Sequence, residues 1–147
     1  MISLAAAALA ACGGAPDQSA TGSAQDNLQL TGPVKADSSA EKGGGCIWKP
    51  AGFDLYFTSG SMQGGAVVAF HAVVGVGGIG DQTASSTDGS GTALELKVAG
   101  KTLKATDGTI HVTDGDLQAK KWKGTLDGTF EDGTKVTGSW SCQAVLG

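Results

Sequence analysis

Side chains suited to catalysis or metal binding are few in this sequence, and they are poorly grouped. His71 and His111 are the two imidazoles, and neither has a second His or Cys at the spacing of a zinc site. The Ser-Gly-Ser sequence at 59–61 lacks the strand–turn–helix context of a nucleophile elbow. Asp114 and Asp116 flank a predicted turn in water, which is a poor setting for a pair of catalytic carboxylates. We therefore expect no enzymatic activity, no metal site and no cofactor.

The first of the three cysteines follows an apolar segment at 2–11. This segment has the length of the hydrophobic region of an export signal and is shorter than the ~20 residues of a membrane-spanning helix. The sequence Leu-Ala-Ala-Cys at 9–12 resembles the bacterial lipobox, whose cysteine is acylated with fatty acids such as palmitate and becomes the new N-terminus. The resemblance implies a signal peptide at 1–11 and a lipid anchor at Cys12. No Lys or Arg precedes the apolar segment, so either the true start lies upstream of Met1 or the signal is inefficient.

The other two cysteines, Cys46 and Cys142, stand at the two ends of the predicted folded part. Exported proteins fold where disulfides form, so we expect these two residues to pair. A bridge closing a loop of roughly a hundred residues would stabilise the fold by about 4 to 5 kcal/mol on the loop-entropy model.

The sequence between the lipobox and the second cysteine is rich in Gly, Ser, Ala and Pro. It is too polar to bury a core, so we interpret residues 12–45 as the lipidated cysteine followed by a flexible tether. The apolar residues of LQLTGPV at 28–34 allow one additional strand, which Pro33 would restrict to a sheet edge. The folded domain is then expected at 46–147.

The predicted domain is all-β, because short apolar segments alternate with turn signals every eight to twelve residues. Strands are expected at 53–57 and 65–76, the second apolar on both faces, and a long loop at 77–91. Further turns are expected at Ala99-Gly100, Asp107-Gly108 and Asp114-Gly115, with a β-bulge at Lys120-Lys121. The result is an antiparallel meander of about seven to eight strands that forms a small β-roll, barrel or sandwich.

The segment Trp122 to Cys142 predicts a β-hairpin in the greatest detail. Glu-Asp-Gly at 131–133 is typical of a three-residue loop whose glycine takes a positive φ. This loop length places all the aromatic and aliphatic residues on one face. The expected pairs are Phe130 with Thr134, Gly128 with Val136, Leu126 with Gly138, Gly124 with Trp140 and Trp122 with Cys142. Trp140 can then cover the bare backbone of Gly124.

The charge balance excludes a nucleic-acid partner. The net charge is −4, whereas a polyanion requires clustered Lys and Arg. Lys120, Lys121 and Lys123 lie close together, and we interpret them as part of a solvated outer face.

The lipobox, the Ser/Thr/Ala/Gly-rich tether and the β-domain bounded by two cysteines together resemble small exported bacterial lipoproteins. In layout the chain is similar to the mycobacterial nineteen-kilodalton lipoprotein antigen family. The segment WKGTLDGTF at 122–130, followed by VTGSWSC at 136–142, looks like a hairpin that recurs at the end of many such lipoproteins of unassigned activity. The resemblance implies acylation of Cys12 and a location in the cell envelope, facing the periplasm or the exterior.

Two functions are compatible with these patterns. The first is a non-enzymatic envelope lipoprotein, held to the lipid membrane through Cys12, whose β-domain binds another macromolecule such as an envelope protein. The alternative is a carrier of a small apolar ligand, with residues 77–91 as a lid over a cavity. The residues expected to line that cavity are Leu55, Val67, Ala69 and Val73. An interior filled by side chains would favour the first function.

Overall fold

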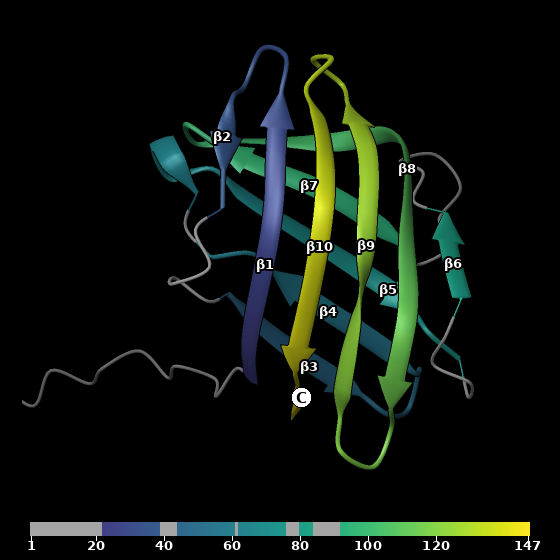
Figure 1. Cartoon of the computed structure of the whole chain (residues 1–147). Coiled ribbons are helices and arrows are strands. Elements are labelled where there is room, and N and C mark those ends of the chain that lie inside the picture. The colour runs from purple at the N-terminus through teal and green to yellow at the C-terminus, as the bar shows by residue number, and fades with distance from the viewer. Residues whose placement is uncertain (1–21, 39–43, 61, 76–79, 84–91) are drawn as a thin grey trace, which may run out of the picture.

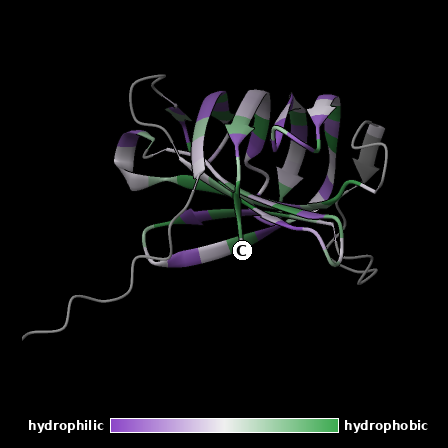
Figure 2. Cartoon of the chain, turned by 90° about the horizontal axis from the view of Figure 1, so that it is seen from below, coloured by the Kyte–Doolittle hydropathy of each residue, from purple (hydrophilic) through white to green (hydrophobic). Residues whose placement is uncertain are grey.

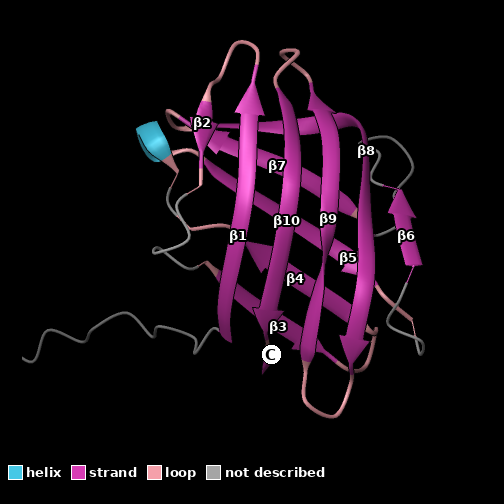
Figure 3. Ribbon diagram, in the orientation of Figure 1, coloured by secondary structure: helices cyan, strands magenta, loops and turns pink. Residues whose placement is uncertain are grey.

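The computed structural model describes residues 22–38, 44–60, 62–75, 80–83 and 92–147. Strands dominate these residues, with one short 3-10 helix at Gln63–Gly65 (Figure 3). The strands are β1 Gly22–Thr31, β2 Ala36–Asp37, β3 Gly45–Lys49, β4 Asp54–Thr58, β5 Val67–Val73, β6 Gly80–Thr83, β7 Ala93–Val98, β8 Lys101–Asp116, β9 Lys121–Phe130, β10 Lys135–Gln143 and β11 Val145–Leu146.

Eight of the strands form a closed antiparallel barrel. Their order is β3-β4-β5-β7-β8-β9-β10-β1, and pairing of Gly22 with Cys46 and of Ser23 with Gly45 closes the barrel between β1 and β3. In Figure 1 the long strands β1, β10, β9 and β8 form a front layer that crosses a back layer of β3, β4, β5 and β7. The predicted all-β antiparallel fold is confirmed, and the barrel is the form that it takes.

The C-terminal hairpin has the predicted register. Gly124 pairs with Trp140, Leu126 with Gly138 and Trp122 with Cys142 between β9 and β10. Gly133 has a φ of 85°, as the three-residue loop requires, and the amide of Phe130 donates to the carbonyl oxygen of Thr134. Asp132 completes the loop by accepting from the Thr134 amide at 2.8 Å. Local turn chemistry and the alternation of side chains were therefore sufficient to predict this element.

The predicted domain boundary at residue 46 is wrong, because β1 lies within the predicted tether. This strand is no edge strand: it pairs along its length with β10, and its other side contacts β3 near Gly22 and β2 near Leu30. Pro33 does not interfere, since β1 ends at Thr31 before the turn. Where β3 diverges from β1, the inward-facing Asp26 accepts a hydrogen bond from the amide of Gly60 at 3.0 Å.

Three predicted features between residues 105 and 121 are also corrected. Neither Asp107-Gly108 nor Asp114-Gly115 forms a turn, because both lie within the long strand β8. Gly108 instead permits close packing, since an added Cβ would lie 3.0 Å from the carbonyl oxygen of Asp127. The β-bulge is not at Lys120-Lys121: the register shifts occur within β8 itself, before Asp107 and before Asp114. These irregularities bend β8 so that it pairs first with β7 and then with β9.

The interior of the barrel is filled by side chains from all eight strands. Phe57, Phe70 and Trp140 form one aromatic cluster, with ring centroids 4.8 to 5.7 Å apart. Trp48 and Trp122 form a second cluster, with centroids 4.8 Å apart. Figure 2, which looks onto the lower end of the barrel, shows hydrophobic segments where the two layers face each other. Aliphatic residues fill the remainder: Leu28, Leu30, Leu55, Val68, Leu94, Leu96, Ile110, Val112, Leu126 and Val136 are all nearly inaccessible to solvent.

Candidate functional site

The proposed lipidation residue, Cys12, lies outside the described residues. The loop predicted at 77–91 is described for β6 alone, which pairs with β8 from Thr109 to Val112. No helix among the described segments combines the length and apolar character needed to cross a bilayer. Acylation of Cys12 and a lid at 77–91 therefore stay predictions.

Cys46 and Cys142 lie together inside the barrel as free thiols. Both are buried and lie on the strands that flank β1, where they pair with Gly22 and Trp122 respectively. A hydrogen bond with the Cys46 thiol, together with burial, raises the pKa of the Cys142 thiol well above its usual value. The bond between the two sulfurs is not formed in this structure, so the structure brings the predicted partners into contact and leaves the disulfide itself a prediction.

The four residues expected to line an apolar cavity do not share a face. Leu55 points into the barrel and is completely buried, whereas Val67, Ala69 and Val73 point outward from β5 and are half-buried. The register separates them, because Leu55 pairs with Ala72 while Val73 pairs with Asp54. The predicted ligand-binding set is therefore wrong as a set. The apolar character of both faces of β5 reflects a buried inner face and a half-buried outer face.

His71 belongs to a polar and aromatic cluster on that outer face. Its ring stacks on Tyr56 with centroids 4.3 Å apart, and the Nζ of Lys49 lies 4.6 Å from the centre of the Tyr56 ring. The Nε2 atom of His71 lies 3.2 Å from Oδ1 of Asp54, although the geometry is not that of a hydrogen bond. On the opposite layer, His111 lies 3.4 Å from Asp127. Both contacts are structural pairs on strands, and among the described residues no group of His, Cys, Asp or Glu could hold a metal ion.

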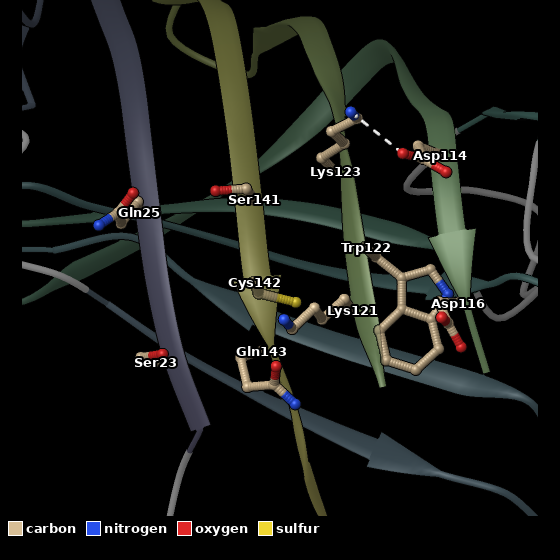
Figure 4. A pocket seen from close by; sticks show the side chains of 10 residues that line it. All are labelled: Ser23, Gln25, Asp114, Asp116, Lys121, Trp122, Lys123, Ser141, Cys142 and Gln143. Atoms are coloured by element: carbon tan, nitrogen blue, oxygen red, sulfur yellow. Dashed lines mark ion pairs between the residues drawn. The ribbon is translucent and has the colours of Figure 1, made fainter. Parts of the chain in front are cut away.

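A hollow lies on the outside of the front layer, near its lower end (Figure 4). It has a volume of about 560 Å³ and extends over β1, β10, β9 and β8. We call it the polar groove. A second hollow of about 490 Å³ continues it up the same strands and shares Gln25, Lys123 and Ser141 with it. The residues that line the polar groove are Ser23, Gln25, Asp114, Asp116, Lys121, Trp122, Lys123, Ser141, Cys142 and Gln143.

Strand register arranges the polar side chains of the groove in rows. One row crosses the four strands through Gln25, Ser141, Lys123 and Asp114. Lys123 and Asp114 form an ion pair at 3.0 Å. Because the Ser141 side chain is short, a hollow remains between the longer side chains of Gln25 and Lys123. The groove therefore offers hydroxyl, amide, ammonium and carboxylate groups in a nearly charge-balanced arrangement. Sequence reasoning missed it because β1, which forms one wall, was not recognised as a strand.

Comparisons with known proteins give no relative for this chain: no protein-family model, no curated protein and no solved structure matches it. Its function is therefore inferred from its own residues.

Proposed function

We propose that this protein is a non-enzymatic lipoprotein of the cell envelope, anchored through acylated Cys12, whose barrel binds another macromolecule. The filled interior is the observation that supports binding of a macromolecule rather than carriage of a small ligand. Phe57, Phe70 and Trp140 occupy the centre of the barrel, where a small-molecule carrier needs its cavity. Binding then takes place on the outer surface, and the polar groove is the surface best suited to it.

The anchor is supported by the sequence before the barrel. The apolar segment at 2–11 ends in Leu-Ala-Ala directly before Cys12, and the first strand begins at Gly22. The intervening chain spans about 30 Å when fully extended, so it holds the barrel close to the lipid surface.

Replacement of the lipidated residue is expected to release the protein from the membrane. The variant Cys12→Ser, expressed behind a complete signal, should not incorporate a fatty-acid probe and should move from the detergent phase to the aqueous phase. Replacement of Cys46 by Ser serves as the control, because that thiol is buried and should leave labelling unchanged. Fatty-acid labelling of the Cys12→Ser protein at the parental level would reject the lipoprotein assignment.

The polar groove should contain the partner-binding surface. A bulky side chain in Ser141→Trp should fill the groove and reduce the amount of co-purifying partner at least about tenfold, while the half-buried position on the outer face leaves the fold intact. Thr137→Trp is the matched control, because Thr137 is exposed on the same strand and face but does not line either hollow. Native mass spectrometry of the detergent-extracted protein gives the readout. Equal loss of the partner from both variants would exclude the groove.

A further inference from the structure

The described part of the chain exposes two large hydrophobic side chains, and both lie at one end of the barrel. Phe53 in the β3–β4 turn is 37% exposed, and Leu146 in β11 is 56% exposed. Their surroundings are continuous: the ring of Phe53 packs on Trp48 with centroids 6.1 Å apart, and the carbonyl oxygen of Trp48 accepts from the amide of Gly147. Two exposed apolar residues would be ordinary if scattered, but their proximity forms a local apolar surface.

Phe53 is held there in an unfavourable backbone conformation. Its φ of 52° lies in the left-handed region, which bulky residues rarely adopt. Glycine or asparagine would fit the turn with less strain, so the turn itself gives no reason for phenylalanine. Part of the Phe53 ring packs on Trp48, and the exposed part is available for contact with a surface outside the fold.

Two lysines lie at the end of the barrel where the β8–β9 loop meets the C-terminal segment. Lys120 lies in the β8–β9 loop, where its carbonyl oxygen accepts from the amide of Ala144, and Lys121 begins β9. Nearby, Oδ1 of Asp116 accepts hydrogen bonds from the backbone amides of Gln118 and Ala119. We define the lower rim as Phe53, Leu146, Lys120 and Lys121. Apolar side chains with lysines at the same end of a domain suit the boundary between lipid tails and anionic headgroups.

The chain reaches this same end from its N-terminal side. The start of β1 lies at the lower end of the barrel in Figure 1, the end at which the C-terminus and the β8–β9 loop also lie. An added Cβ on Gly22 would collide with the end of β10 at Gln143, which confirms that the two segments touch. A chain anchored through Cys12 therefore brings the lower rim, rather than the upper turns, towards the lipid.

We propose that the lower rim is a membrane-contact surface that rests on the headgroup region of an anionic bilayer. This inference rests on the proposed anchor, which supplies a high local concentration of lipid. Phe53 and Leu146 enter the interface while Lys120 and Lys121 contact the headgroups. Lys121 belongs to both the lower rim and the lower edge of the polar groove, and the remainder of the groove opens on the side of the barrel.

Vesicle partitioning tests the rim apart from the anchor. The full chain carrying Cys12→Ser is mixed with vesicles of equal parts phosphatidylglycerol and phosphatidylcholine, and the bound fraction is measured by sedimentation. Adding Phe53→Gly and Leu146→Ser should lower the partition coefficient about tenfold, because two apolar side chains no longer enter the interface. Thermal unfolding should show an intact fold, since glycine accepts the positive φ of residue 53.

Matched charge changes complete the test. Lys120→Gln with Lys121→Gln should weaken partitioning about fivefold on the anionic vesicles and leave it unchanged on pure phosphatidylcholine. Lys35→Gln with Lys135→Gln, two exposed lysines at the upper end, should have no effect on either. Equal partitioning of the rim and upper-end variants would reject the lower rim as a membrane-contact surface. A dimer in solution that Phe53→Gly and Leu146→Ser abolish would also reject it. Failure of the anchor is read separately, from the fatty-acid labelling of Cys12.

Discussion

Trp140→Ala is expected to lower the free energy of unfolding by about 3 to 5 kcal/mol. Trp140 is 2% exposed and contacts both Phe57 and Phe70, so its removal opens a void in the central aromatic cluster. The indole nitrogen also donates to the carbonyl oxygen of Thr125 at 3.2 Å, and the alanine variant leaves that acceptor without this partner. Its ring further lies against the bare backbone of Gly124 on β9. Urea denaturation monitored by circular dichroism measures the loss.

Two controls separate the parts of this effect. Trp140→Phe retains an aromatic ring and removes the indole nitrogen, so it should cost about 1 to 2 kcal/mol. Lys123→Ala changes the neighbouring strand on the solvated face, where the ion pair with Asp114 is 61% exposed on both sides, and it should cost less than about 0.5 kcal/mol. If Lys123→Ala lowered the free energy of unfolding as much as Trp140→Ala, the assignment of Trp140 to a tightly packed inward face would be wrong.

The hairpin of β9 and β10 could be predicted from sequence because its information is local. The loop at 131–133 fixes the register, and the alternation of side chains then assigns each residue to a face. A shift of one residue would place Trp140 in water and Lys135 in the core.

The strand β1 could not be recognised because its pattern is weak on its own. Its inward positions include Gly22, Ala24 and Asp26, and its outward positions are Ser, Gln, Asn and Thr, a composition that is typical of a linker. Only Leu28 and Leu30 signal burial. The strand is stable because β10 already presents a full set of hydrogen-bonding groups, so tertiary context overrides local propensity.

The polar groove and the lower rim could not be predicted from the sequence for a related reason. The groove requires Gln25 on β1 to lie beside Ser141 on β10, a pairing between the two ends of the barrel. The rim brings Phe53 and Leu146 together although they are almost a hundred residues apart. Long-range pairing of this kind has no local sequence signal. In contrast, the contact between Cys46 and Cys142 was predicted from the expectation of export, because disulfides form between cysteines in that compartment.

Oxidation of Cys46 and Cys142 is expected to raise the free energy of unfolding by about 4 to 5 kcal/mol relative to the reduced protein. The bond would link β3 to β10 at the place where β1 closes the barrel through two residue pairs. The electron balance requires a disulfide oxidant: its disulfide accepts two electrons, the Cys46–Cys142 bond forms, and two thiols of the oxidant are released. Non-reducing mass mapping should find the two cysteine peptides linked.

The bond should form before the barrel closes rather than after. In the folded reduced protein, the hydrogen bond with Cys46 and burial keep the pKa of Cys142 high, so the reactive thiolate is scarce. Oxidised glutathione should therefore oxidise the unfolded chain rapidly and the folded chain slowly.

The reduced protein is also expected to lose stability at alkaline pH. Because the pKa of Cys142 in the folded protein lies above the ordinary value of 9.0, the reduced protein should keep its full free energy of unfolding below pH 9 and lose part of it at higher pH. The bridged protein has no thiol to ionise, so it should lack this alkaline loss.

Paired denaturation curves with and without reductant decide whether the bridge stabilises the fold. A variant with both Cys46→Ala and Cys142→Ala gives the baseline, since its curve should not respond to reductant. The parent protein should show a higher midpoint when oxidised, and the difference should disappear after reduction. Coincident curves for the oxidised and reduced parent, with the mass-mapped bond present, would show that the bond strains the barrel by as much as it restrains the unfolded chain.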